Sequence, residues 1–215
     1  MFREINNGGR RINVCKFPSQ KNGRNIWTES IIELCFAQMC ERDRNVISYS
    51  TQTARINYEL DGRRRRYTSD FLIYRRDKRP LIVEVKYERQ ITPWFDQLFR
   101  LVTVVCDRAG YDFLVVTERQ IIVEPFLSNI KRLRYYSRTP ILPYHQLLCH
   151  EFLATTEEAT LREICESFAR RNVNKSVVLA LIYHDFLLTD LSVPLGPNSS
   201  IRLSNSNDQQ EGMLG

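Results

Sequence analysis

Three ionisable residues lie in two short segments whose other residues favour a β-sheet. Asp70 follows Tyr67-Thr-Ser, while Glu84 and Lys86 alternate with valines in Leu81-Ile-Val-Glu-Val-Lys-Tyr87. Residues two apart in a strand share a face, so Glu84 and Lys86 are predicted to point to the same side. Two carboxylates and an ammonium group at one place on a sheet are the groups that metal-assisted hydrolysis of a phosphodiester needs.

The expected register of this hairpin brings the two carboxylates together. With Asp77 at the centre of the loop, Asp70 lies directly opposite Glu84, with their Cβ atoms about 5 Å apart. Two carboxylates that close repel each other unless a cation lies between them. Mg²⁺ uses one or two carboxylates and keeps waters and phosphate oxygens as its other ligands. The pair therefore predicts a Mg²⁺ site, at which Mn²⁺ is expected to substitute, with Lys86 beside the scissile phosphate.

A third acid is expected from the helix that precedes these strands. Glu33 interrupts the apolar run from Ile31 to Phe36 and is the first choice. Glu29 lies one turn earlier on the same face and is the alternative, although its place after a predicted Thr28 N-cap also suits the helix dipole. The alternative to a metal site is that these acids and Lys86 have only a structural role, on a solvated hairpin with cross-strand ion pairs.

The elements around the candidate site follow from periodicity and turn signals. Proline at position 93 suits the first turn of a helix, and the apolar segment after that helix has the pattern of a strand. The predicted elements are a helix over residues 30–40, strands near 46–50 and 53–60, the two strands described above, a helix over 94–108, a strand over 111–117, a short strand over 120–123 and a basic helix over 126–136. A helix that links two strands as a crossover predicts a mixed sheet.

A change of composition at residues 139–143 predicts a second domain. Helical patterns follow at about 144–154, 157–170 and 174–188, as in a helix-turn-helix, and residues 189–203 are predicted to form a two-stranded wing. The fold class predicted is α/β, a mixed sheet flanked by helices, followed by a small, mainly helical winged-helix domain. The predicted divisions are an arm at 1–25, a nuclease domain at 26–138, the winged helix at 139–203 and a flexible tail at 204–215.

The charge of the chain favours an anionic partner. Its net charge is +6 and its pI is about 9.1, which makes nucleic acid the leading candidate, ahead of an acidic protein or a membrane surface. Two basic segments are candidates for DNA contact, with a solvated surface as the alternative for each. Their residues are Arg63, Arg64, Arg65 and Arg66, and Lys131, Arg132 and Arg134.

Six cysteines without metal-binding spacing predict buried, reduced thiols and a reducing intracellular compartment. No apolar stretch has the length expected of a membrane span or the pattern of a signal peptide. A cytoplasmic protein is therefore expected.

Five short segments carry a resemblance to a known family: Ser30–Glu33, Val46–Tyr49, Ile56–Tyr58, Arg66–Leu72 and Val83–Lys86. Together they resemble the TnsA endonuclease subunits of heteromeric cut-and-paste transposases, within the PD-(D/E)xK nuclease superfamily, over about residues 26–117. The resemblance implies a restriction-endonuclease-like fold and agrees with a C-terminal winged helix.

The resemblance also implies roles and partners. Glu33, Asp70 and Glu84 would hold metal, Lys86 would assist catalysis, and the 5′ strand would be cut at each transposon end. A DDE transposase (TnsB-like) would cut and join the 3′ strand, and an AAA+ ATPase (TnsC-like) would control target use, in a bacterial cytoplasm. The alternatives are a stand-alone restriction or repair nuclease, and a non-catalytic DNA-binding or assembly adaptor whose acids are structural.

Overall fold

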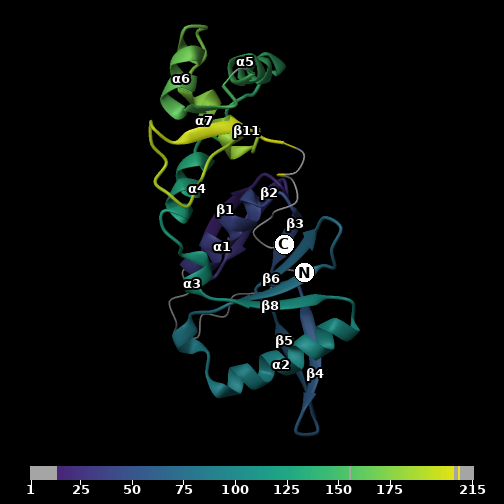
Figure 1. Ribbon diagram of the computed structural model, residues 1–215. Coiled ribbons are helices and arrows are strands. Elements are labelled where there is room, and N and C mark those ends of the chain that lie inside the picture. The colour runs from purple at the N-terminus through teal and green to yellow at the C-terminus, as the bar shows by residue number, and fades with distance from the viewer. Residues whose placement is uncertain (1–13, 155, 206–207, 209–215) are drawn as a thin grey trace. The chain divides into compact units, whose positions relative to one another are not determined.

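The structure is a computed structural model that describes residues 14–154, 156–205 and 208 (Figure 1). The chain divides into two compact units between Ile122 and Val123. Helix α4 (Phe126–Arg134) packs against α7 (Lys175–Tyr183) in the second unit. The predicted boundary between residues 138 and 139 therefore falls inside that unit.

The first unit is built on a four-stranded sheet. Its strands are β3 (Val46–Thr51), β6 (Phe71–Arg75), β7 (Leu81–Val85) and β8 (Asp112–Val116), in that spatial order. Strand β7 pairs antiparallel with β6 and parallel with β8, so the predicted mixed sheet is confirmed. All five residues of β7 are buried, as in a strand covered on both faces.

Two helices cover the opposite faces of this sheet. From α1 (Ile31–Arg42), Phe36 packs edge-on against Phe71, with ring centroids 4.9 Å apart. From α2 (Pro93–Arg108), Val102 packs in a cluster with Ile82. Phe71 pairs with Val83, so the neighbouring Ile82 points to the other face. The helix predicted to begin at Pro93 is confirmed.

Two predictions for this unit are wrong, one in the start of a helix and one in the type of an element. The N-cap of α1 is Ser30, not Thr28, because Thr28 is the last residue of strand β2 (Arg24–Thr28). The strand predicted over residues 120–123 is replaced by the short helix α3 (Glu118–Ile121), at whose start the N–H and the hydroxyl of Thr117 both donate to the side-chain oxygen of Gln120.

Two hairpins complete the first unit. Strand β1 (Cys15–Ser19) pairs with β2, so the segment predicted as an arm is folded from Cys15, whereas residues 1–13 lie outside the described residues. Strands β4 (Arg55–Leu60) and β5 (Arg63–Thr68) are joined by the predicted Asp61-Gly62 turn. The four arginines that follow this turn, Arg63–Arg66, belong to β5.

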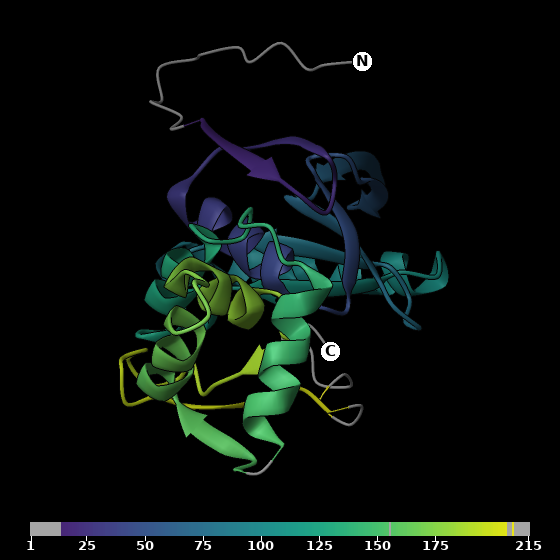
Figure 2. The same ribbon diagram turned by 90° about the horizontal axis from the view of Figure 1, so that it is seen from above.

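The second unit combines helices with a small antiparallel sheet of order β10–β11–β9 (Figure 2, green to yellow). The helix predicted over 144–154 is confirmed within a residue. The next two predicted helices are shorter, because their ends form strands β9 and β10. The elements are α5 (Pro143–Leu153), β9 (Glu158–Thr160), α6 (Leu161–Ala169), α7, β10 (Leu187–Leu188) and β11 (Ser200–Leu203). Of the two-stranded wing predicted over residues 189–203, only β11 forms a strand, and its partners β10 and β9 lie outside that range.

The predicted flexible tail from residue 204 lies outside the described residues except for 204, 205 and 208. Of these, Asp208 forms a two-bonded ion pair with Arg202, at 2.7 and 2.6 Å. The cysteines at positions 35, 40, 106, 149 and 165 are free thiols. Among the described residues, no helix combines the length and the apolar character that crossing a membrane would require.

Candidate active site

Asp70, directly before β6, and Glu84, near the end of β7, lie together at the end of the β6–β7 hairpin that is opposite its turn. Phe71 pairs with Val83, and the same antiparallel register places Asp70 opposite Glu84, as the sequence predicted. Asp70 Oδ2 accepts a hydrogen bond from the backbone N–H of Val85 at 2.7 Å. The side chain of Glu84 is only 6% exposed. A half-buried and a buried carboxylate thus lie side by side at the open end of the central hairpin.

Two protein donors hold the Glu84 carboxylate. Lys86 Nζ donates to Oε1 at 2.7 Å, which confirms that both side chains point to one side. The Tyr67 hydroxyl, from β5, donates to Oε2. Burial, and then the charge of Glu84, raise the pKa of Tyr67, so this hydroxyl keeps its proton and remains a donor. The orientation of Glu84 is therefore fixed from both sides.

The first turns of α2 position the ammonium group of Lys86. Its Nζ lies 4.2 Å from the centroid of the Phe95 ring and 5.9 Å from that of Phe99. Cation–π attraction of this kind is stronger in a desolvated place, and the Lys86 side chain is only 17% exposed. The helix that follows the acid-bearing strand therefore directs Lys86 back towards Glu84.

The electrostatic environment of Asp70 favours a bound cation. Burial, and then the charges of Glu84 and Glu33, raise its pKa to about 8, while the Val85 N–H and Lys86 act in the opposite direction. A carboxyl group with this pKa is mostly protonated at neutral pH. A cation between Asp70 and Glu84 would remove the repulsion and allow both to ionise.

Glu33 caps the helix on which it lies. Its Oε2 accepts the backbone N–H of Glu29 at 2.9 Å, and its Oε1 accepts the Ser30 hydroxyl at 2.7 Å. Burial raises the pKa of Glu33, these two hydrogen bonds lower it, and the charges of Glu29 and Glu84 raise it. Both oxygens of Glu33 are thus engaged at the N-terminus of α1. The alternative residue, Glu29, precedes the N-cap and is not in the first turn.

The donor set fits a metal held by two carboxylates. Over residues 14–154, 156–205 and 208, no group of three or more His, Cys, Asp or Glu side chains is arranged to hold a metal ion. Asp70 and Glu84 still supply hard oxygen donors in the number that Mg²⁺ commonly takes from a protein. Glu33 could join them only after its side chain leaves the α1 cap.

The two predicted DNA-binding groups belong to different units. Arg63–Arg66 are all exposed on β5. On α4 of the second unit, Lys131 is exposed and Arg134 is half-buried. Arg132 Nη1 donates to the Leu195 carbonyl at 2.7 Å, so that residue also ties α4 to the segment before β11.

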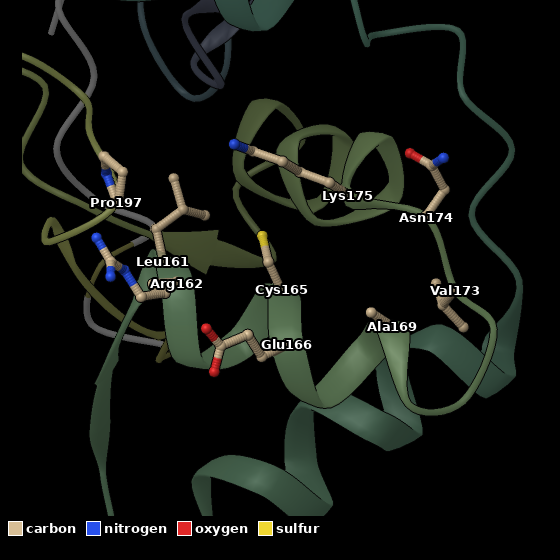
Figure 3. Close-up of a pocket in the computed structure, with 9 residues that line it drawn as sticks. All are labelled: Leu161, Arg162, Cys165, Glu166, Ala169, Val173, Asn174, Lys175 and Pro197. Atoms are coloured by element: carbon tan, nitrogen blue, oxygen red, sulfur yellow. The ribbon is translucent and has the colours of Figure 1, made fainter.

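A cavity in the second unit is lined by none of the predicted site residues. It has a volume of about 630 Å³ and lies between α6, the start of α7 and Pro197 (Figure 3). Its lining mixes basic and acidic groups, among them Arg162, Glu166 and Lys175. It has no pair of acids like Asp70 and Glu84.

The sheet and the arrangement of Asp70, Glu84 and Lys86 are consistent with the PD-(D/E)xK nuclease superfamily. Residues 43–118 match the sequence model of the family described as TnsA-like endonuclease N terminal. This stretch is therefore similar to the N-terminal domain of TnsA-like endonucleases, as the resemblance predicted. Asp70, Glu84 and Lys86 lie within the match, whereas Glu33 and the second unit lie outside it. No curated protein matches the chain.

Sequence reasoning missed three residues that contact the candidate site: Tyr67, Phe95 and Phe99. The strand period offered no signal for Tyr67, because it lies three residues before Asp70, and an odd separation in one strand would place the two side chains on opposite faces. The two aromatic residues have helical spacing on α2, which equally describes a helix packed on a core. Their contact with Lys86 depends on how α2 packs against the sheet.

Proposed function

We propose that the chain is a Mg²⁺-dependent DNA endonuclease that cleaves the 5′ strands at transposon ends, as a subunit of a heteromeric cut-and-paste transposase. One observation carries this proposal. Asp70 and Glu84 are apposed, with Lys86 beside them, inside the residues that match the TnsA-like endonuclease family. That family is the source of the link to transposition.

The chain's own groups divide the work of phosphodiester hydrolysis. Asp70 and Glu84 would hold Mg²⁺, with Mn²⁺ as a substitute. When bound, the metal supplies a Lewis acid for the phosphate and lowers the pKa of a water nucleophile. Lys86 Nζ, one hydrogen bond from Glu84, is placed to donate to a phosphate oxygen. Tyr67 orients the other oxygen of Glu84, and Glu33 is the proposed third acid.

The partners proposed are the DNA of transposon ends, a TnsB-like DDE transposase and a TnsC-like AAA+ ATPase. The second unit is proposed to be a winged helix, supported by the order α5, β9, α6, α7, β10, β11 and by its three-stranded sheet. Residues 177–183 of α7 are all buried. Because a helix that reads DNA needs exposed polar side chains, we propose that this unit contacts protein rather than bases.

The test is a strand-specific cleavage assay on end-labelled transposon DNA, with the partner transposase present. Asp70→Ala is expected to reduce 5′-strand cutting at least about 100-fold, since it removes several kcal/mol of transition-state stabilisation. Asp107→Ala is the matched control, because this acid is exposed near the end of α2. Wild-type 5′ cutting by Asp70→Ala would refute the assignment.

Two other functions give different results. Robust cleavage by the purified chain alone would favour a stand-alone restriction or repair nuclease. The adaptor alternative is supported by the fact that Glu33 and Glu84 each have protein donors on both oxygens. Calorimetry with Mg²⁺ and Mn²⁺ decides that case. Absence of any binding that depends on Glu84 would favour the adaptor.

A further inference from the structure

The β4–β5 hairpin presents two chemically different faces. Directly paired residues of two strands share a face, and the pairs include Ile56 with Tyr67 and Tyr58 with Arg65. Ile56 and Tyr58 are buried in a cluster with residues of α2. Arg63 and Arg65 therefore share the face that is turned towards α2.

The opposite face, which we call the open face, carries Arg55, Asn57 and Glu59 from β4 and Arg64 and Arg66 from β5. All five residues are exposed. Three arginines against one glutamate leave it a charge of +2. Within the described part of the chain, the side chains of these three arginines form no hydrogen bond or ion pair. Their guanidinium groups are thus available to an external anion.

We propose that the open face binds the phosphate backbone of duplex DNA and holds the duplex on one side of the cut. This inference rests on the proposed function. Guanidinium groups suit phosphate because their planar donors can bind two oxygens at once. A two-stranded β-ribbon also has the width that the major groove admits. In Figure 1 the tip of this ribbon extends past α2. A duplex could therefore lie against the tip without contacting α2.

Strand β5 connects the open face directly to the acids. It ends at Thr68, two residues before Asp70. Its Tyr67, which donates to Glu84, lies on the face turned towards α2, so the link from the open face to the acids is the short length of chain between them. Arg66 and Arg64 precede Asp70 by four and six residues, which is about 13 to 20 Å of extended chain. At 3.4 Å per base pair, the open face reaches phosphates about four to six base pairs from the scissile bond.

The first experiment measures binding of the full chain to a 30-base-pair duplex by fluorescence anisotropy, without divalent metal, over a range of salt. Arg64→Ala/Arg66→Ala is expected to weaken binding about tenfold or more and to reduce the salt slope by about 2. Arg63→Ala/Arg65→Ala is the matched control. It removes the same charge from the other face and is expected to change affinity less than about threefold. Equal losses in the two double variants, or no loss, would overturn the proposal.

Because a variant can lose binding by misfolding, Glu59→Gln provides a test in the opposite direction. It removes the acid opposite Arg64 on the open face and is expected to tighten binding. An unchanged or weaker affinity for this variant contradicts the open face as the binding surface.

The second experiment places neutral methylphosphonates four to six base pairs from the cut in transposon-end DNA. Cleavage by the wild type with its partner transposase is expected to fall, and cleavage by Arg64→Ala/Arg66→Ala is expected to be insensitive to the same substitutions. If the two proteins are equally sensitive, the open face does not contact the phosphates four to six base pairs from the cut. If the wild type binds with the predicted face dependence but never cuts, the proposed function fails while the open face stands.

Discussion

The site is dominated by two carboxylates that the hairpin register brings together. The position of Asp70 opposite Glu84 could be predicted from the sequence. Phe71 and Val83 are equally far from the centre of the turn and pair with each other, and this register does not depend on what packs around the hairpin. The donors to Glu84 follow from different physics. Tyr67 reaches Glu84 from another sheet, and Phe95 meets Lys86 from a helix. Such contacts depend on tertiary packing, which a strand period does not contain.

The raised pKa of Asp70 predicts that, without divalent metal, the chain loses stability as pH rises from about 4 to 8. Below pH 4, Asp70 is protonated in both the folded and the unfolded state. Above pH 4 the unfolded chain releases this proton, whereas the folded protein keeps it until about pH 8, so the free energy of unfolding falls across that window. Urea midpoints from pH 5 to 8 measure the effect.

Asp70→Asn is the control for this titration, since the amide keeps the shape and has no proton to lose. It is expected to flatten the pH dependence and to be more stable than the wild type at pH 8. Mg²⁺ is expected to stabilise the wild type more at pH 8 than at pH 6, because the metal competes with the proton. Identical pH profiles for wild type and Asp70→Asn would show that Asp70 titrates normally.

At the scale of elements, predictions succeeded where the signal is local. Pro93 opens α2 because proline suits a first turn. The start of α1 was misplaced because β1 pairs Cys15 with Thr28, which keeps Thr28 in a strand. Arg63–Arg66 form a strand despite their charge, since β4 supplies the buried face for the pair. In both cases, pairing with a partner strand overrides the local preference of the residues.

The capping role of Glu33 makes its structural and catalytic roles separable. Glutamine keeps one side-chain oxygen that can accept the Glu29 N–H, so Glu33→Gln should keep much of the cap while losing the charge. We expect it to melt within about 2 °C of the wild type and to cut transposon-end DNA at least about tenfold more slowly. Thermal melts and the strand-specific assay measure the two effects.

Glu33→Ala completes the comparison, because it removes the cap as well. It is expected to lose about 1 kcal/mol of stability in addition to activity. Wild-type cleavage by Glu33→Gln would make Glu33 a helix cap only, and would leave Asp70 and Glu84 as the two metal-binding acids.

At the scale of the molecule, the division near residue 122 was not visible in composition. The prolines around residue 140 suggested a boundary at 138, but α4 before them is amphipathic, and its Leu133 belongs to the buried cluster that also contains Phe168 and Val178. The cluster around Leu98 and Val102 is confined to the first unit. A boundary is set by which cluster a helix joins, and composition does not specify that choice.

Two separate buried clusters predict two thermal transitions, of which Mg²⁺ moves only one. Asp70 and Glu84 lie in the first unit, so metal should raise the melting temperature of that transition by mass action. Phe168→Ala should lower the other transition by more than about 10 °C, since truncating a phenylalanine that is 1% exposed costs roughly 3–5 kcal/mol. Tyr135→Ala is the control, because that ring is 85% exposed in the same unit. Differential scanning calorimetry separates these outcomes. A single transition moved by both Mg²⁺ and Phe168→Ala would mean that the two clusters unfold as one.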